Sequence, residues 1–124
     1  MKIRICLLLL AILLSIYVCG IRILLITSNS MRPALVKGDI IVTCKSTYRK
    51  GSIITFGHHR SLVTHRIVST VPLRTKGDAN VLNDSATVRP ENIVGKACLV
   101  FSTGKLLENI HEYVIRYARL EVKK

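Results

Sequence analysis

An apolar stretch of 22 residues, from Ile5 to Ile26, constrains this chain most strongly, because Arg22 is its single charged residue. At about 1.5 Å per residue, a helix of that length reaches roughly 33 Å, enough to cross the hydrocarbon core of a bilayer. Two basic residues and no acidic residue precede the stretch, and a short basic tail stays in the cytoplasm. We therefore predict a cytoplasmic tail at residues 1–4, a transmembrane anchor at residues 5–26, and a remainder outside the cytoplasm.

A cleavable secretory signal is the alternative, because a basic tail followed by an apolar run describes both kinds of segment. Val18-Cys19-Gly20 would even serve as a weak cleavage site of small residues. The apolar residues resume after Gly20 as Ile-Arg-Ile-Leu-Leu-Ile, however, so the run is longer than the core of a signal. This length favours a retained anchor.

The remaining 98 residues are strongly basic, with 16 Lys or Arg against 7 Asp or Glu, a net charge of +9. Such a balance suits nucleic acid or an anionic membrane surface. A domain tethered to a bilayer meets lipid headgroups first, and the chain has only six Phe and Tyr for stacking on bases. We expect contacts with membrane lipid and no nucleic-acid partner.

The cysteines and histidines give no sign of a metal centre. Cys6 and Cys19 lie in the predicted anchor, whereas Cys44 and Cys98 lie in the outer domain, where a disulfide between them is possible but not required. The four histidines are not spaced with cysteines as metal ligands are. We predict no metal and no cofactor.

Short runs rich in Ile, Val and Thr alternate with turn residues after the anchor. The runs occupy residues 39–44, 52–56, 61–71 and 93–101, and Gly, Lys and Asn separate them. This pattern is typical of short strands joined by turns. We predict a small, mainly β domain over residues 27–103.

Residues 104–124 have helical rather than β periodicity. Apolar residues recur there at spacings of three and four, and charged residues occupy the opposite face. The apolar members are Leu106, Leu107, Ile110, Tyr113, Val114, Tyr117 and Leu120; the charged members are Lys105, Glu108, Glu112, Arg116, Arg119 and Lys123. An amphipathic helix of this kind either packs on the β domain or lies in the membrane interface.

A nucleophile, a base and acidic residues follow one another in the β domain. A serine hydroxyl becomes a useful nucleophile when an imidazole accepts its proton, and a carboxylate can hold that imidazole in place. Ser30, His65 and the pair Asp78 and Asp84 occur in this order. Each also has a purely structural reading, because Ser and Asp are common in turns and a histidine can lie in a core.

Four blocks in order resemble type I signal peptidases. Ser-Met-Arg-Pro at 30–33, with Gly-Asp-Ile-Ile-Val at 38–42, resembles the segment that carries their nucleophile. Lys-Gly-Ser-Ile-Ile-Thr-Phe at 50–56 resembles their next strand block. Thr-His-Arg-Ile-Val at 64–68 looks like the general-base block of the endoplasmic-reticulum and archaeal branch, which carries His where most bacterial enzymes carry Lys. Residues 75–96 resemble the last conserved block.

The resemblance implies a role for each matching residue. Ser30 takes the position of the nucleophile, His65 that of the general base, and Asp84 that of the acidic member of the triad. Asp78 matches a second acidic position that supports the site. Ser28 matches the position whose hydroxyl helps to stabilise the oxyanion.

The resemblance also assigns Met31 and Pro33 to the shape of the loop and of the substrate pocket. The sequence departs from the family pattern at three places. Asn29 stands where glycine is usual, the stretch between residues 65 and 77 is short, and the usual proline is missing near Asp84. A second membrane helix follows the catalytic domain in many relatives, and the amphipathic segment takes its place here.

The expected protein is a membrane-bound serine endopeptidase that removes signal peptides from preproteins at small-x-small sites. The expected fold is a signal-peptidase-like β domain with an N-terminal transmembrane helix and a C-terminal amphipathic helix. The resemblance implies that the substrate pairs as a β-strand beside the site. An anchor ending at Ile26, four residues before Ser30, would place the chemistry at the membrane surface, facing the cell exterior or an endoplasmic-reticulum lumen.

Two other functions are open on the sequence. Self-cleaving proteases of the SOS-repressor class share a similar serine block and a β fold, but they use lysine as the base and carry no N-terminal anchor. His65 and residues 5–26 therefore argue against that class. A catalytically silent, membrane-tethered binding or assembly protein is the other alternative, and Asn29 and the short stretch after His65 are the features in its favour.

Overall fold

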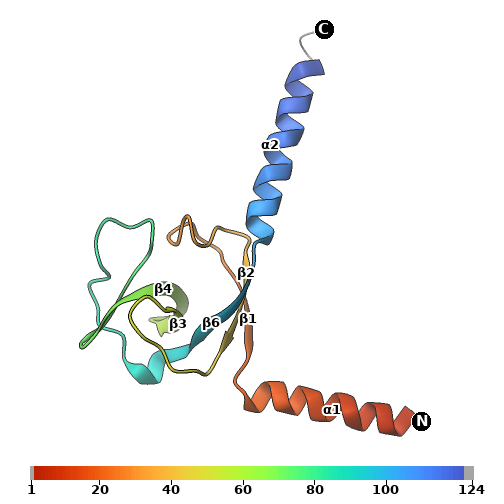
Figure 1. Ribbon diagram of the computed structural model, residues 1–124, viewed down its shortest axis with the longest axis vertical. Coiled ribbons are helices and arrows are strands. Elements are labelled where there is room, and N and C mark those ends of the chain that lie inside the picture. The colour runs from red at the N-terminus through yellow and green to blue at the C-terminus, as the bar shows by residue number, and fades with distance from the viewer. Residues whose placement is uncertain (1, 122–124) are drawn as a thin grey trace.

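Six antiparallel strands form one sheet, and a helix stands at each end of the chain (Figure 1). The structure, a computed structural model, describes residues 2–121 and, within the last helix, side chains up to Ile115. The elements in order are α1 (Lys2–Val18), β1 (Arg22–Leu25), β2 (Ile40–Cys44), β3 (Ile53–His58), β4 (Ser61–Thr70), β5 (Leu73–Lys76), the 3-10 helix η1 (Pro90–Asn92), β6 (Ile93–Phe101) and α2 (Thr103–Glu121).

The sheet has the strand order β1-β2-β6-β3-β4-β5, and every neighbouring pair is antiparallel. The predicted mainly β fold is therefore confirmed, and the four predicted runs correspond to β2, β3, β4 and β6. The edge strands β1 and β5 were not predicted. In Figure 1, α1 and α2 leave the sheet at separate places and extend away from it.

Helix α1 ends at Val18, eight residues before the predicted end of the anchor. Gly20 has a φ of 63°, the left-handed conformation that glycine adopts at low cost. The amide of Gly20 donates to the carbonyl of Tyr17, and the amide of Ile21 donates to the carbonyl of Ile16. These two bonds form a Schellman motif, which terminates a helix. The β-branched and leucine residues that follow then pair with β2 as β1.

No helix within residues 2–121 combines the length and the hydropathy needed to cross a membrane, so the predicted transmembrane helix over residues 5–26 is not found. The predicted tail at residues 1–4 is also not separate, because α1 begins at Lys2. Ser30 lies twelve residues after the end of α1 instead of four after the anchor, and β1 lies between them. Every side chain described in α1 is exposed.

Two clusters of buried apolar side chains hold the body together. One joins Ile54 and Phe56 of β3 to Ile67 of β4, with Leu73 and Val88. The other consists of Ile26, Met31, Leu35 and Ile41. The first three belong to the connection between β1 and β2, and Ile41 belongs to β2. The second cluster supports the segment that carries Ser30.

A disulfide joins Cys44 of β2 to Cys98 of β6. The register between these strands shifts so that Val42 pairs with Leu99 and Thr43 pairs with Ala97, which leaves Cys98 as the extra residue of a β-bulge. The sequence had left this bond open. The bulge turns the Cys98 side chain toward its partner, a placement that spacing in the sequence does not reveal.

Helix α2 begins at Thr103, one residue before the predicted start, and residues 122–124, including Lys123, lie outside the described part of the chain. Its apolar side chains are exposed over the described part, from 44% for Ile115 to 71% for Tyr113. The alternative in which this helix packs its apolar face on the β domain is therefore not observed.

Candidate active site

Residues 27–39, within the connection from β1 to β2, carry Ser30 and are called the Ser30 loop below. Two backbone bonds close its base, from the Ile26 amide to the Asp39 carbonyl and from the Gly38 amide to the Ile26 carbonyl. The Asn29 side chain accepts a hydrogen bond from the Lys37 amide at 3.0 Å. The asparagine that departs from the family pattern therefore joins the two limbs of the loop.

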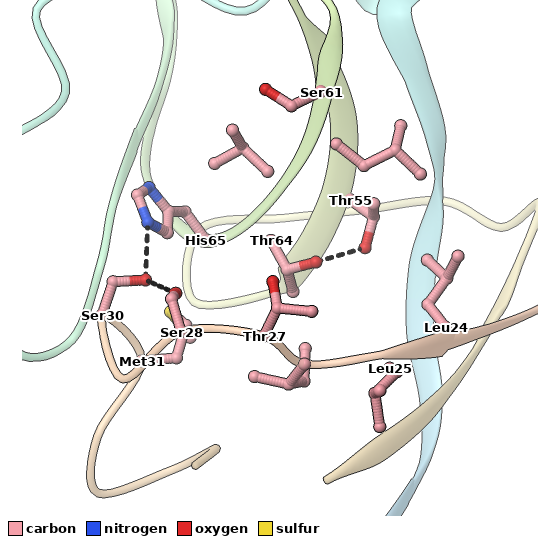
Figure 2. Close-up of a pocket in the computed structure, with 13 residues that line it drawn as sticks. Leu24, Leu25, Thr27, Ser28, Ser30, Met31, Thr55, Ser61, Thr64 and His65 are labelled. Atoms are coloured by element: carbon pink, nitrogen blue, oxygen red, sulfur yellow. Dashed lines mark hydrogen bonds between the residues drawn. The ribbon is translucent and has the colours of Figure 1, made fainter. Parts of the chain in front are cut away.

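His65 lies in the middle of β4, opposite Ile54 of β3, and is 9% exposed. Its Nε2 lies 3.2 Å from Oγ of Ser30, which is within hydrogen-bond reach (Figure 2). The two residues are 35 positions apart in the sequence, and they come from the β1–β2 connection and from β4, which is not a neighbour of β1 or β2 in the sheet. A hydroxyl at this distance can pass its proton to the imidazole.

Asp84 lies beyond β5, on the connection to η1, and faces the other side of the imidazole. Its Oδ2 accepts a hydrogen bond from Nδ1 of His65 at 2.6 Å, which leaves Nε2 as the acceptor for Ser30. The Thr75 hydroxyl donates to the same oxygen at 2.6 Å, and the Asp84 amide donates to the Thr75 carbonyl at 2.9 Å. Ser30, His65 and Asp84 thus have the arrangement of a Ser–His–Asp triad.

Thr75 is a site residue that the sequence did not reveal. It is fully buried on β5, and its hydroxyl donates to Oδ2 of Asp84, the same oxygen that accepts from His65. A threonine in a strand is ordinarily assigned to β propensity. The one available signal was its alternation with Leu73, which places both side chains on the inner face of β5.

Gly77 and Ala79 bring the segment after β5 against the Ser30 loop. The Ala79 amide donates to the Ser30 carbonyl at 2.8 Å. A Cβ on Gly77 would stand 2.6 Å from that carbonyl oxygen and 3.0 Å from Nε2 of His65, so the close approach requires glycine. These contacts set the position of the Ser30 backbone relative to the imidazole.

Asp78 does not contact the imidazole, although the sequence placed it in the supporting part of the site. Its two oxygens accept hydrogen bonds of 2.8 and 2.7 Å from the guanidinium of Arg66, and that guanidinium also donates to the Gly51 carbonyl at 2.9 Å. The hydrogen bonds that Arg66 donates to Asp78 raise the pKa of Arg66, against the opposing effect of burial. Arg66 was not among the predicted residues.

Ser28 lies beside Ser30, with 3.1 Å between the two hydroxyl oxygens (Figure 2). Both hydroxyls line the same groove. The structure therefore brings the predicted oxyanion residue to the reacting side of Ser30, where a hydroxyl can donate to an oxygen that becomes negative.

A groove of about 480 Å³ runs past Ser30 and His65. One wall comes from the end of β1 and the start of the Ser30 loop, and the other comes from β4. The lining residues are Leu24, Leu25, Ile26, Thr27, Ser28, Ser30, Met31, Thr55, Ser61, Leu62, Val63, Thr64 and His65. Met31 lines the groove but is only 2% exposed, whereas Pro33 is exposed and lies outside the lining.

A smaller cavity of about 250 Å³ lies on the far side of His65. Phe56, Val63 and Val88 line it, together with Asp84 and the residues that follow Asp84. The imidazole therefore stands between two hollows, with Ser30 toward the larger and Asp84 toward the smaller.

A comparison with curated proteins finds that the chain is similar to Signal peptidase I W of Bacillus subtilis (strain 168). The two are 36% identical over an alignment of 87 residues, which covers 61% of this chain and 46% of that protein. The chain thus spans less than half the length of this relative. No family model matches the chain. The similarity supports a relation to the signal peptidases, and the fold and the triad geometry agree with it.

Proposed function

We propose that this chain is a serine endopeptidase of the signal peptidase type, with Ser30 as nucleophile and His65 as general base. The observation that carries the proposal is the pair of contacts on one imidazole, Nε2 to Ser30 at 3.2 Å and Nδ1 to Asp84 at 2.6 Å. The partial similarity to a signal peptidase supports the same assignment.

In the proposed acylation step, Nε2 of His65 takes the hydroxyl proton while Oγ of Ser30 attacks the carbonyl carbon of the scissile peptide. The Asp84 carboxylate holds the Nδ1 proton and stabilises the imidazolium that forms. The imidazolium then returns the proton to the leaving nitrogen, and the C–N bond breaks. Water hydrolyses the resulting ester by the same route in reverse, with His65 again taking a proton.

In this proposal, hydrogen-bond donors on the Ser30 loop stabilise the developing oxyanion. In the resting state, the Ser28 hydroxyl lies 3.1 Å from Oγ of Ser30, so it needs only to rotate toward a carbonyl oxygen bonded to Ser30. The Ser30 amide is the second donor that the family resemblance implies. Removing one such donor typically costs about 10²–10³-fold in kcat.

An extended peptide is the substrate that the groove suits best. Residues 61–65 of β4 pair with β3, whereas the pairing of β4 with β5 begins only at Arg66. Strand β1 is the edge of the sheet on the opposite wall. Two strand edges therefore border the groove, and each offers backbone groups to an added strand.

We propose that the cleaved sites carry small side chains. The hydroxyls of Thr55 on β3 and Thr64 on β4, which both line the groove, bond to each other at 2.8 Å (Figure 2). Met31 and Val63 limit the room beside the reacting atoms. Such a lining favours residues of the size of alanine, as expected for small-x-small sites.

Lipid contact remains part of the proposal. Cross-strand pairing aligns Ile23, Val42 and Leu99 in one row and Leu25, Ile40 and Phe101 in the next, on a single face of the sheet. Ile23, Leu25, Leu99 and Phe101 are all more than half exposed. We propose that this face and the exposed apolar α1 contact a membrane, with the basic residues near anionic headgroups.

The proposed location outside the cytoplasm has independent support from the cysteines. The disulfide between Cys44 and Cys98 suits an oxidising compartment, since such bonds persist poorly in a reducing cytoplasm. The proposal therefore keeps a catalytic domain at the cell exterior or in a comparable lumen.

A cleavage assay tests the proposed function. The purified chain, added to anionic lipid vesicles, is given a preprotein with an Ala-x-Ala site and a matched preprotein with bulky residues at that site. We expect cleavage after the second alanine in the first preprotein only, and loss of cleavage in Ser30→Ala and His65→Ala. Equal processing by these variants and the parent would exclude the enzyme and leave the silent binding protein.

A further inference from the structure

The first turn of α2 is attached to the Ser30 loop. The Thr103 hydroxyl donates to the Gly38 carbonyl at 2.5 Å, and the Gly104 amide donates to Oδ1 of Asp39 at 2.9 Å. Both bonds span 65 residues of sequence. The start of the last helix is therefore joined to the loop that carries Ser30.

Asp39 is the centre of this connection, with no exposed surface. Its Oδ2 accepts the Val36 amide at 2.9 Å, and its own carbonyl accepts the Ile26 amide at 2.8 Å. A carboxylate beside the first amides of a helix gains from the helix dipole as well as from the hydrogen bond. Asp39 thus links α2 to the second limb of the Ser30 loop through its buried side chain, and it links Ile26, just after β1, through its backbone carbonyl.

Glycine at position 104 allows the helix to come this close. Gly104 is buried, and a Cβ there would stand 2.8 Å from the Asp39 amide nitrogen and even closer to the Lys37 carbonyl oxygen. A Cβ on Gly38, whose φ is 93°, would stand 3.1 Å from the Gly104 Cα. The two backbones are in direct contact, so a movement of α2 displaces residues 36–39.

A further contact reaches the other limb of the loop. Arg32, two residues after Ser30, forms an ion pair with Glu108 on the second turn of α2. The apolar side chains of α2 are meanwhile exposed through Ile115. The helix therefore contacts the Ser30 loop at its first two turns, while its apolar face remains uncovered.

We propose that α2 is a positioning element for Ser30, and that Asp39 is the positioning residue through which it acts. This inference rests on the proposed function. Contacts from α2 hold the loop at both limbs, and the hydrogen bond between Ser30 and His65 depends on the placement of that loop. A displacement of about 1 Å at reacting atoms can cost on the order of 10²-fold in rate.

The test compares Thr103→Ala with Thr103→Ser, which keeps the hydroxyl, and with Lys105→Ala, an exposed change on the same turn. Hydrogen exchange reports on residues 29–37 without any substrate, and steady-state kinetics on an Ala-x-Ala preprotein gives kcat and KM. Loss of one hydrogen bond corresponds to about a fivefold change in a local equilibrium. We expect Thr103→Ala to exchange about fivefold faster in the loop.

The same variant should lose kcat with an unchanged KM and an unchanged pH profile, while both control variants match the parent. Asp39→Asn should have a larger effect than Thr103→Ala. If this substitution weakens the fold, hydrogen exchange of the same loop amides still measures the effect. Thr103→Ala matching Lys105→Ala in both measurements would overturn the inference, as would equally faster exchange throughout β3 and β4. A parent chain that cleaves nothing would contradict the proposed function instead, and loop exchange would still decide the coupling.

Discussion

Each face of β4 carries a basic side chain bonded to a carboxylate, but the two pairs differ in what else they contact. On the inner face, His65 meets Asp84 and Thr75 beside Ser30; toward the other face, the next residue, Arg66, meets Asp78. Both carboxylates belong to the segment that follows β5, and they are six positions apart. The inner pair contacts a hydroxyl in a groove, whereas the outer pair binds a backbone carbonyl of the β2–β3 connection. A carboxylate bonded to a basic side chain therefore acquires a chemical role only where that side chain also contacts a reacting group, as His65 contacts Ser30.

Asp84→Asn should produce the largest difference in activity between substitutions on the two faces of β4. The amide cannot hold the Nδ1 proton of His65 as a carboxylate does, so the productive tautomer and the imidazolium both lose support. We expect kcat to fall by about 10³–10⁴-fold with little change in the midpoint of thermal unfolding. Asp78→Asn is the matched control from the same segment. Equal losses in kcat in the two variants would contradict the division between the faces.

Gly77 lies next to Asp78 and touches the inner site, so Gly77→Ala tests how closely the two faces are joined. The new Cβ would stand 2.6 Å from the Ser30 carbonyl oxygen, and the Ser30 loop must move. We expect kcat to fall by about 10²-fold. Gly57→Ala is the control, because its nearest atom would be 3.9 Å away. Full activity in Gly77→Ala would show that the close approach is not needed.

A smaller effect on the inner face should follow Thr75→Val, which keeps the shape of the side chain and removes the hydroxyl bonded to Asp84. The carboxylate then loses one of its two side-chain donors and orients His65 less firmly. We expect kcat to fall about tenfold, by analogy with the effect of groups that orient a ligand through another residue. Thr75→Ser should restore activity, and failure of that rescue would assign the loss to packing.

The pair of Arg66 and Asp78 should give the smallest effect, and that effect should be on stability. Arg66 is about a third exposed, so Asp78→Asn should lower the free energy of unfolding by about 1 kcal/mol. Since the folded-state pKa of Arg66 is raised, its contribution is complete below the ordinary pKa of an arginine and is lost only above it. The change measured by denaturant unfolding should therefore be the same at pH 6 and pH 9. A loss confined to one of these pH values would contradict this account of the pair.

The sequence predicted the four strands that are rich in Ile, Val and Thr, and it predicted the order Ser30, His65, Asp84. It missed β1, because Ile23, Leu24 and Leu25 continue an apolar helix without a change in composition. The left-handed Gly20 that separates the two elements had no distinctive neighbours.

The sequence also could not predict contacts that depend on how the strands pair in the sheet. The register that brings Arg66 to Asp78, the bulge that turns Cys98 toward Cys44, and the burial of Thr75 all follow from long-range packing. The sequence could name two acidic residues for the site, but it could not tell which one faces His65. The resemblance assigned Asp84 rather than Asp78 to the triad, and in the structure it is Asp84 that bonds to His65.

The pairing of Ser30 with His65 is tested most directly by placing a thiol at the position of the serine. In a chain carrying Ser30→Cys, with Cys6→Ala and Cys19→Ala to remove the free thiols, the new thiol should form a thiolate beside the imidazole. Its pKa should fall below the ordinary value of about 8.5, and alkylation by iodoacetamide near pH 6.5 should be at least about tenfold faster than in the same chain with His65→Ala. Equal alkylation rates with and without His65 would contradict the assignment of His65 as the base for Ser30.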